Sequence, residues 1–475
     1  MKKIFIILLF IIILSSCHGK LVSKNYGKLI YTDFVVPEEF DESKTYNLTF
    51  WAKNDSNKFQ QQIYNNAISE FEKIYPNINI NIVQYNDYTK IYNDVIKNIA
   101  TKTTPNISIA YPDHVAAYAI GENVVVPLDN LISDENYGLG GGKIKFSAPK
   151  KEDYIEKFLN EGIIQKHYWT MPFMRSSEAL YVNKTYLLEN GFEIPEVFTW
   201  DYIWEVCDYA LKKAKLENKV MLPLIYKSTD NMFIQLLKQY NFDYTSENGE
   251  VFFLKDDICD MLLNLSEVID NGYLETFSRV SYPGNYFNRA QCIFMIDSTA
   301  GSTWVGSEAP LLDIPASEVV DFETEVFMIP QVDTSNPSMI SQGPSICLFA
   351  KEDRQEVLAS WIFIQYLLTN NVQIPYSQTE GYVPVTKLAT NSTSYQDYLK
   401  DESQYDVKIK STELVLNNID NTFITPVFNG SSLCRSASGY LIEAMFSTKY
   451  RDKNSVFDLF DVVNKRYKLS TYVIR

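Results

Sequence analysis

The feature that most constrains the fold of this chain is a regular alternation of strand and helix patterns near its start. Polar and apolar residues alternate over residues 46–52 and, strictly, over residues 77–85, and this period predicts two strands. Between them, residues 57–76 place apolar side chains at helical spacing and end in a proline. A second helical pattern over residues 89–101 and a short strand within residues 105–113 follow. The β-α-β-α-β order predicts a parallel sheet covered by helices.

Similar patterns continue through the rest of the 475 residues. Helices are predicted over residues 198–215, with Thr199 as the N-cap, and over residues 353–370, and a strand is predicted over residues 290–297. A chain of this length exceeds one ordinary core, so we expect an α/β protein of two or three domains.

The first residues are typical of an export signal rather than of the fold. A basic start is followed by an apolar run over residues 4–14, which is too short for the roughly 17–25 residues of a membrane span. The letters LSSC then resemble the lipobox of bacterial lipoproteins, which implies a signal peptide over residues 1–16 and a lipid on Cys17. The alternative is an ordinary signal peptide followed by a chance cysteine. Residues 17–44 lack a clear period, and we interpret them as a tether.

Charge and cysteine content exclude several classes of site. The net charge of −16 argues against a nucleic-acid partner and fits a soluble monomer kept apart by self-repulsion. Five cysteines remain after Cys17; their number is odd, and no CxxC occurs. We therefore expect buried free thiols rather than disulfides, and no metal or cofactor.

One stretch, WTMPFMRSSEALYVNK over residues 169–184, places its most polar residues inside an otherwise apolar, strand-like segment. Arginine and glutamate are rarely buried without a partner. Either this is an edge turn, or the chain crosses a wet region at Arg175.

In their order along the chain, several stretches resemble the family 1 extracellular solute-binding proteins, the maltose-binding-like receptors of ABC importers. They are AISEFEKIYPNINI, IATKTTPNISIAYPDHVAAYAIGENVVVPLD, MPFMRSSEALYVNKTYLLENGFEIPEVFTWDYI, NRAQCIFMIDSTAG and TEGYVPVTK. Asn106 stands where the family often has aspartate, and GLGGGK with its flanks is an insertion. The resemblance covers almost all of the chain after residue 45.

The resemblance implies a type II-like periplasmic-binding-protein fold, in which two α/β lobes close on a ligand by a hinge motion. Lobe I is expected to hold residues 45–173 and 331–381. Lobe II is expected to hold residues 174–330 and, with the C-terminal helices, residues 382–475.

By the same resemblance, the chain is expected to be a lipid-anchored receptor in the cell envelope, facing the periplasm or the cell exterior. It is expected to bind a small solute, a carbohydrate in the first instance, to deliver it to a membrane permease of the ABC type, and to catalyse nothing.

Ligands in open α/β sheets bind beyond the carboxyl ends of strands. In lobe I this position, together with the resemblance, indicates a first set of contacts: Trp51, Asn54, Asp55, Tyr111, Asp113, His114 and Gly343. The crossing between the lobes indicates a second set, Arg175, Ser176 and Ser177, with Glu178 beside them. In lobe II the third set is Lys227, Asp230, Ser298, Thr299, Gly301, Trp304, Asn429 and Arg435. Three have alternative structural roles: Asp113 as a helix cap, Arg175 in an ion pair with Glu178 or another carboxylate, and Trp304 in the core.

Two other functions stay open. A receptor for a non-sugar solute, such as a polyamine, a glycerol phosphate ester or a peptide, is favoured if charge dominates the cleft. Unpaired Arg175 and Arg435 indicate an anionic ligand, whereas Asp113 and Asp230 indicate a cationic or hydroxyl-rich one. A secreted glycoside hydrolase needs two carboxylates across a cleft, but the chain has no HExxH or GxSxG motif and only three histidines.

Overall fold

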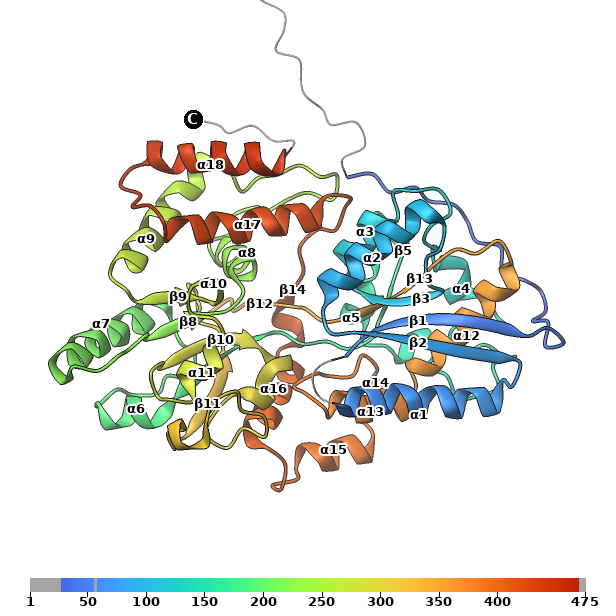
Figure 1. Ribbon diagram of the computed structural model, residues 1–475, viewed down its shortest axis with the longest axis horizontal. Coiled ribbons are helices and arrows are strands. Elements are labelled where there is room, and N and C mark those ends of the chain that lie inside the picture. The colour runs from blue at the N-terminus through green and yellow to red at the C-terminus, as the bar shows by residue number, and fades with distance from the viewer. Residues whose placement is uncertain (1–26, 55–57, 470–475) are drawn as a thin grey trace, which may run out of the picture.

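The computed structural model describes residues 27–54 and 58–469 and contains two five-stranded sheets, one in each lobe (Figure 1). The sheet of lobe I has the order β2-β1-β3-β13-β6. Its strands are β1 (Tyr46–Lys53), β2 (Ile78–Tyr85), β3 (Ile107–Ala110), β6 (Met171–Pro172) and β13 (Ser345–Leu348). β1 pairs in parallel with both β2 and β3, which confirms the predicted parallel sheet, and β13 adds an antiparallel strand.

The sheet of lobe II has the order β11-β7-β10-β8-β9. Its strands are β7 (Glu178–Asn183), β8 (Leu224–Tyr226), β9 (Leu274–Thr276), β10 (Phe294–Ser298) and β11 (Thr324–Met328). β8 is parallel to β9 and β10, whereas β7 is antiparallel to β10 and β11. Two short pairs, β4 (Ile163–Ile164) with β5 (His167–Tyr168) and β12 (Met339–Ile340) with β14 (Thr422–Phe423), complete the named strands.

Helices cover both sheets, as the helical periodicities predict. Those of lobe I are α1 (Lys58–Ile74), α2 (Tyr88–Thr101), α3 (Pro112–Tyr118), α4 (Asp129–Ser133), α5 (Glu156–Asn160), α12 (Arg354–Leu367) and α13 (Asn370–Ser377). Those of lobe II are α6 (Lys184–Glu189), α7 (Trp200–Glu217), α8 (Thr229–Gln239), α9 (Cys259–Asp270), α10 (Phe277–Val280), α11 (Pro283–Phe287), α17 (Ser431–Met445) and α18 (Lys453–Tyr467). Thr199 caps α7 by accepting a hydrogen bond from the Tyr202 backbone N–H.

Each lobe has its own apolar core. In lobe I, Phe50 from β1 and Phe71 from α1 both contact the ring of Phe363 from α12, at centroid distances of 5.8 and 5.0 Å. In lobe II, Phe294 of β10 packs against Phe198, which lies just before α7. Burial of each such side chain contributes on the order of 1.5–3 kcal/mol to the stability of its lobe.

The chain crosses between the lobes more than once. Residues 173–177 lead from β6 to β7, and residues 329–344 lead back from β11 to β13. The two crossings pair with each other, because the Ser176 and Gln342 backbones exchange hydrogen bonds of 2.8 and 3.0 Å. The polar break of the sequence therefore lies between two cores.

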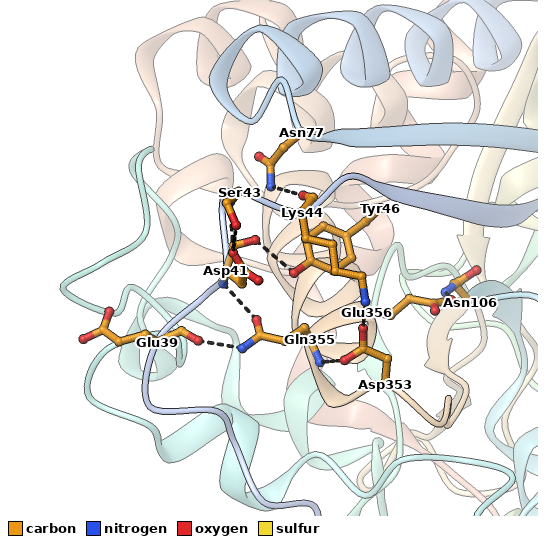
Figure 2. Close-up of polar contacts among 10 residues, drawn as sticks. All are labelled: Glu39, Asp41, Ser43, Lys44, Tyr46, Asn77, Asn106, Asp353, Gln355 and Glu356. Carbon is orange, nitrogen blue, oxygen red and sulfur yellow. Dashed lines mark hydrogen bonds and ion pairs between the residues drawn. The ribbon is translucent and has the colours of Figure 1, made fainter.

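Residues 27–44 belong to the folded unit, so the interpretation of residues 17–44 as a tether is wrong for this part. Phe40 is buried in the core of lobe I and stacks on Tyr46. Figure 2 shows the polar contacts of the residues on either side of it in the sequence: the side-chain amide of Gln355, at the start of α12, donates to the Glu39 carbonyl and accepts from the Asp41 backbone N–H. An apolar anchor with paired backbone groups on both sides fixes a segment that has no regular period.

The C-terminal part departs from the expected boundary at residue 381. Val383 and Val385 lie in the core of lobe I, so the returning segment of lobe I extends beyond that residue. The next helices are α14 (Lys387–Thr390), α15 (Thr393–Leu399) and α16 (Asp406–Asn417), and α16 packs against β11 of lobe II. Val415 of α16 lies in the core of lobe I, so this helix contacts both lobes and the third crossing runs along it.

Two expectations concern bulk properties of the chain. The five cysteines that the structure describes are free and buried, as predicted. Within residues 27–54 and 58–469, no helix combines the length and the apolarity that a membrane crossing requires. The predicted signal peptide and Cys17 lie outside the described residues.

Candidate functional site

A cavity of about 720 Å³ lies between the two lobes. Lobe I contributes Lys53, Asn86, Asp87, Tyr88, Tyr111, Glu380 and Tyr382 to its wall. Lobe II contributes Lys227, Tyr282, Pro283, Gly284, Asn285, Met295, Asp297, Ser298, Ala300, Gly301, Trp304, Val305 and Asp313. The volume falls within the range of about 300–1,000 Å³ that small-molecule sites occupy.

The carboxyl ends of four strands supply the centre of this wall. Lys53 ends β1, Tyr111 follows β3, Lys227 follows β8 and Ser298 ends β10. Ligands of open α/β sheets bind at such ends, because the loops that leave them converge there. The rule for strand ends therefore accounts for residues on both walls of this cavity, one wall from each lobe.

The wall of lobe I is aromatic. The rings of Tyr88 and Tyr111 lie 4.5 Å apart between centroids, and Tyr382 lines the cavity beside them. Burial raises the pKa of each of these three hydroxyls, so all three stay neutral at any physiological pH. Neutral phenols offer an apolar face together with a hydroxyl that both donates and accepts.

Lobe I also presents one amine, Lys53, and two carboxyls, Asp87 and Glu380, to the cavity. Burial lowers the pKa of Lys53 to about 8, against the opposing attraction of Glu380 and Asp87, and the ammonium lies 5.5 Å from the ring centroid of Tyr88. Burial raises the pKa of Glu380 to about 7, and the hydroxyl of Thr303, which donates to this carboxyl over 2.8 Å, partly offsets the rise. Lys53 and Glu380 therefore change charge close to neutral pH.

Lobe II presents an ion pair, a hydroxyl and an indole. Lys227 Nζ lies 2.7 Å from Asp297 Oδ2, and this pairing raises the pKa of Lys227 although burial alone lowers it. Ser298 is the residue after Asp297, and Trp304 ends the short 3-10 helix (Thr299–Trp304) that Ser298 caps. The positive charge on this wall is thus neutralised within the protein.

Four predicted contacts gather at a second place, where α3 of lobe I meets α8 and α17 of lobe II. Arg435 Nη2 lies 3.0 Å from Asp230 Oδ2 and donates to Asn231 Oδ1. Burial opposes the charge of this arginine, but Asp230 and, from across the junction, Asp113 raise its pKa. Burial lowers the pKa of His114 beside it. Asp113 lies in the first turn of α3 without capping it, since Tyr111 is the N-cap residue. These groups belong to the interface between the lobes rather than to the cavity wall.

Arg175 is the main correction to the predicted site. Its side chain is 1% exposed, and its Nε lies 2.6 Å from Glu161 Oε2. Its Nη1 donates to the carbonyls of Met174 and Pro344 and its Nη2 to Ser345 Oγ. Because the guanidinium binds partners in lobe I and in both crossings, the prediction that it contacts a ligand does not hold in this conformation, and the ion-pair alternative does.

Comparison with known proteins places this geometry in a family. The sequence profile of bacterial extracellular solute-binding proteins matches residues 66–401. The chain belongs to this family. It is a family of binding proteins and not of enzymes. A comparison with curated proteins gives no significant match.

Several solved solute-binding proteins share the fold of this one at low sequence identity. The GacH receptor of Streptomyces glaucescens, solved with acarbose, has a TM-score of 0.66 at 15% identity over 89% of this chain and 99% of its own. The ABC substrate-binding protein Lmo0181 from Listeria monocytogenes, in complex with cycloalternan, has a TM-score of 0.67 at 16% identity over 90% and 100% of the two chains. UgpB from Mycobacterium tuberculosis, in complex with glycerophosphocholine, has a TM-score of 0.66 at 16% identity over 89% and 98%.

Five of the predicted contacts lie on the cavity wall of this solute-binding protein. They are Tyr111, Lys227, Ser298, Gly301 and Trp304. Their contact with a ligand stays a prediction.

Three further predicted residues lie in the crossings between the lobes and do not line the cavity. Ser176 and Ser177 hold the crossings together, since the Ser177 hydroxyl donates to the Ile340 carbonyl and Ser177 N–H donates to Thr299 Oγ1. Gly343, at φ +135°, lets the second crossing approach the first, because a Cβ there would lie 2.4 Å from the Met174 carbonyl oxygen.

The other predicted residues are engaged elsewhere in the protein. Trp51 packs on Tyr85, Asn54 donates to Gln84, and the carbonyl of Asn429 accepts from Gly27. Asp55 lies outside the described residues.

Sequence reasoning missed several wall residues of this solute-binding protein: Lys53, Tyr88, Tyr282, Asp297, Glu380 and Tyr382. The signal for Lys53 was present, because it ends the same strand as Trp51 and shares its face by the two-residue period. Glu380 and Tyr382 lie in TEGYVPVTK, which contributed only to the family resemblance and indicated no contact residue. Among the residues described, no group of His, Cys, Asp or Glu is placed to hold a metal ion.

Proposed function

We propose that this chain is the receptor of an ABC importer for a carbohydrate, which it captures between its lobes and delivers to a membrane permease. The observation that carries the proposal is the aromatic lining from both walls: Tyr88, Tyr111 and Tyr382 from lobe I, Tyr282 and Trp304 from lobe II. Aromatic faces on opposite sides suit a flat, partly apolar ring, and the phenol hydroxyls suit its hydroxyl groups. The GacH receptor and Lmo0181, which share the fold, are described with carbohydrate ligands.

The charge distribution supports a hydroxyl-rich ligand over a strongly anionic one. Both arginines that would attract an anion, Arg175 and Arg435, are paired with carboxylates. On the cavity wall, Lys227 is paired with Asp297, and the carboxyl of Glu380 offsets Lys53. Little net positive charge is left for a phosphate or a carboxylate.

A thermal-shift screen tests this proposal. The probes are maltose, acarbose, cycloalternan, glycerophosphocholine and spermidine, each added over a range of concentrations. A ligand at 100 times its Kd adds about 2.7 kcal/mol to the free energy of unfolding, so a binder raises the midpoint in a concentration-dependent way. We expect a shift with at least one of the three carbohydrates. A shift with spermidine alone, or steady hydrolysis of an oligosaccharide by the protein, contradicts the proposal.

A zwitterionic phosphate ester is the second candidate, and one observation favours it. The cavity wall carries amines and carboxyls of both lobes, and glycerophosphocholine carries both charges. UgpB, in complex with that compound, shares the fold. A shift with glycerophosphocholine and none with the carbohydrates selects this candidate.

Lipid attachment at Cys17 is a separate part of the proposal. A short apolar run before LSSC supports it, and stable anchoring of a protein takes more than one acyl chain, as a lipoprotein modification supplies. Expression of Cys17→Ser in a bacterial host should move the protein from the membrane fraction to the soluble fraction. Retention of this variant in the membrane fraction contradicts the anchor.

A further inference from the structure

The hydroxyl of Ser298 has an unusual set of partners for a residue on the cavity wall. Its Oγ accepts a hydrogen bond of 3.2 Å from the Ala300 backbone N–H and a second of 3.0 Å from Gln342 Nε2. A serine hydroxyl has one donor and two acceptor positions. Both acceptor positions are therefore filled, and Ser298 faces the cavity with its proton still to be donated.

Gln342 cannot reverse this arrangement by turning its amide. Its Nε2 also donates to the Ser177 carbonyl over 3.0 Å, and its Oε1 accepts from Asn231 Nδ2 over 3.3 Å. A flipped amide would place a carbonyl oxygen against the Ser177 carbonyl and an NH₂ against the Asn231 NH₂. Two mismatched contacts make the flipped state costly, so the polarity of the amide is fixed.

The Asn231 amide is itself held from two sides. Its Nδ2 donates to Glu178 Oε1 over 3.0 Å, and its Oδ1 accepts from Arg435. Arg435 has no acceptor atom, so the orientation of the Asn231 amide follows from it. A chain of hydrogen bonds thus runs from the interface between the lobes, through the second crossing, to the cavity.

We infer that Gln342 is a positioning residue for ligand recognition: it holds the Ser298 hydroxyl as a hydrogen-bond donor, so the ligand presents an acceptor oxygen at that point. This inference rests on the proposed function, because it places the ligand in the same cavity. It narrows the ligand class as well. A sugar hydroxyl, a ring oxygen or a phosphoryl oxygen accepts from Ser298, whereas the ammonium of a polyamine does not.

The donor orientation of the Ser298 hydroxyl can be tested without any ligand, by replacing the hydroxyl with a thiol. In Ser298→Cys the sulfur receives the N–H groups of Ala300 and Gln342, and donors to a thiolate favour the charged form. Adding Gln342→Glu replaces one donor with a carboxylate. We expect the pH midpoint of iodoacetamide alkylation of the introduced thiol to rise by about one unit in the double variant. The unmodified full chain gives the background for Cys17 and the five buried thiols.

The matched control is Gln239→Glu in the Ser298→Cys background. Gln239 is another half-buried amide with two protein partners, Trp200 and the Pro330 carbonyl, but it does not line the cavity. Gln239→Glu should leave the alkylation midpoint of the introduced thiol unchanged. If Gln342→Glu fails to fold, Gln342→Ala removes the same donor and should raise the midpoint by a smaller amount. Equal midpoints in the single variant and all double variants overturn the inference.

A binding experiment then tests whether the Ser298 donor takes part in ligand recognition. Maltose, acarbose and cycloalternan are titrated into the unmodified chain, Ser298→Ala, Gln342→Glu and the combination of the two. We expect roughly a tenfold loss of affinity in each single variant and little further loss in the combination, because both act through one donor. Additive losses contradict the inference. If the unmodified chain binds none of the five screening probes, the proposed function fails, while the thiol experiment still decides the polarity.

Discussion

Lys227 and Asp297 form an ion pair of 2.7 Å at the point where two parallel strands of lobe II end in the cavity. Asp297 is 8% exposed, so its carboxylate depends on this partner. The pair neutralises the wall of lobe II and at the same time points two polar groups at the space between the lobes.

We expect Lys227→Met to destabilise the protein by about 3 kcal/mol, because it leaves a buried carboxylate uncompensated. Lys227→Met combined with Asp297→Asn should recover most of that loss, since no isolated charge remains. Chemical denaturation of both variants measures the difference. Equal stability of the single and the combined variant contradicts a dependence of Asp297 on Lys227.

Trp304 provides a test of the aromatic lining. Trp304→Ala should weaken carbohydrate binding by about tenfold, or 1.4 kcal/mol, as isothermal titration measures it. Trp200→Ala is the control, because Trp200 packs on Trp204 in lobe II and does not line the cavity. Equal affinity losses in the two variants would show that Trp304 acts only through the fold.

Glu380 gives the stability of the protein a pH dependence whose sign is fixed. Burial raises its pKa from 4.5 to about 7. Between these values the folded chain keeps a proton that the unfolded chain releases, so the free energy of unfolding falls as the pH rises through this window. Glu380→Gln should be more stable than the unmodified chain by about 2 kcal/mol at pH 8 and equal to it at pH 4.

Denaturation at several pH values checks this prediction. Glu189→Gln, which removes an exposed carboxylate that does not line the cavity, is the control for net charge. If Glu380→Gln leaves the slope of stability against pH unchanged between 4.5 and 7, Glu380 does not hold the extra proton.

Arg175 should matter for stability more than for binding. Arg175→Met removes the partner of Glu161, whose side chain is 8% exposed, and we expect a loss of about 3–5 kcal/mol. Adding Glu161→Gln should restore part of it. At temperatures where all three proteins are folded, their ligand affinities should agree within about twofold. A large affinity loss in the combined variant would restore Arg175 as a ligand contact.

The segment before the first strand is expected to stabilise lobe I. Phe40→Ala should lower the free energy of unfolding by about 3 kcal/mol, because the ring is buried against Tyr46 and Tyr75. Val35→Ala, in the same segment but exposed, should change it by less than about 0.5 kcal/mol. Similar small effects of both substitutions would indicate that the segment adds little to the core.

The periodic parts of the chain made the fold predictable. The alternation in β1 and β2 and the apolar spacing in α1 depend on neighbouring residues, so the sequence alone specifies them. Residues 27–44 have no period, and their order comes from contacts such as Gln355 with Glu39, more than 300 positions away. No local pattern can indicate such a partner.

The candidate site likewise contains residues that the sequence predicts and residues that it does not. Residues at strand ends, such as Tyr111 and Ser298, follow from the rule for α/β sheets. Arg175 was expected to face the cleft because its polarity stood out, but its partner Glu161 comes from a different element and accounts for that polarity. Glu380 and Tyr382 follow a helix, where the rule for strand ends says nothing.

The first described residues join the two lobes at their margin. Gly27 donates its backbone N–H to the Asn429 carbonyl of lobe II, and Ile30 donates to the Ala119 carbonyl of lobe I, three positions along the chain. Any separation of the lobes at this edge has to stretch or release one of these bonds. The exchange of the Gly27 amide hydrogen with deuterium is therefore a built-in reporter of opening, which needs no probe attached to the protein and lies on the stretch of chain that leads towards Cys17.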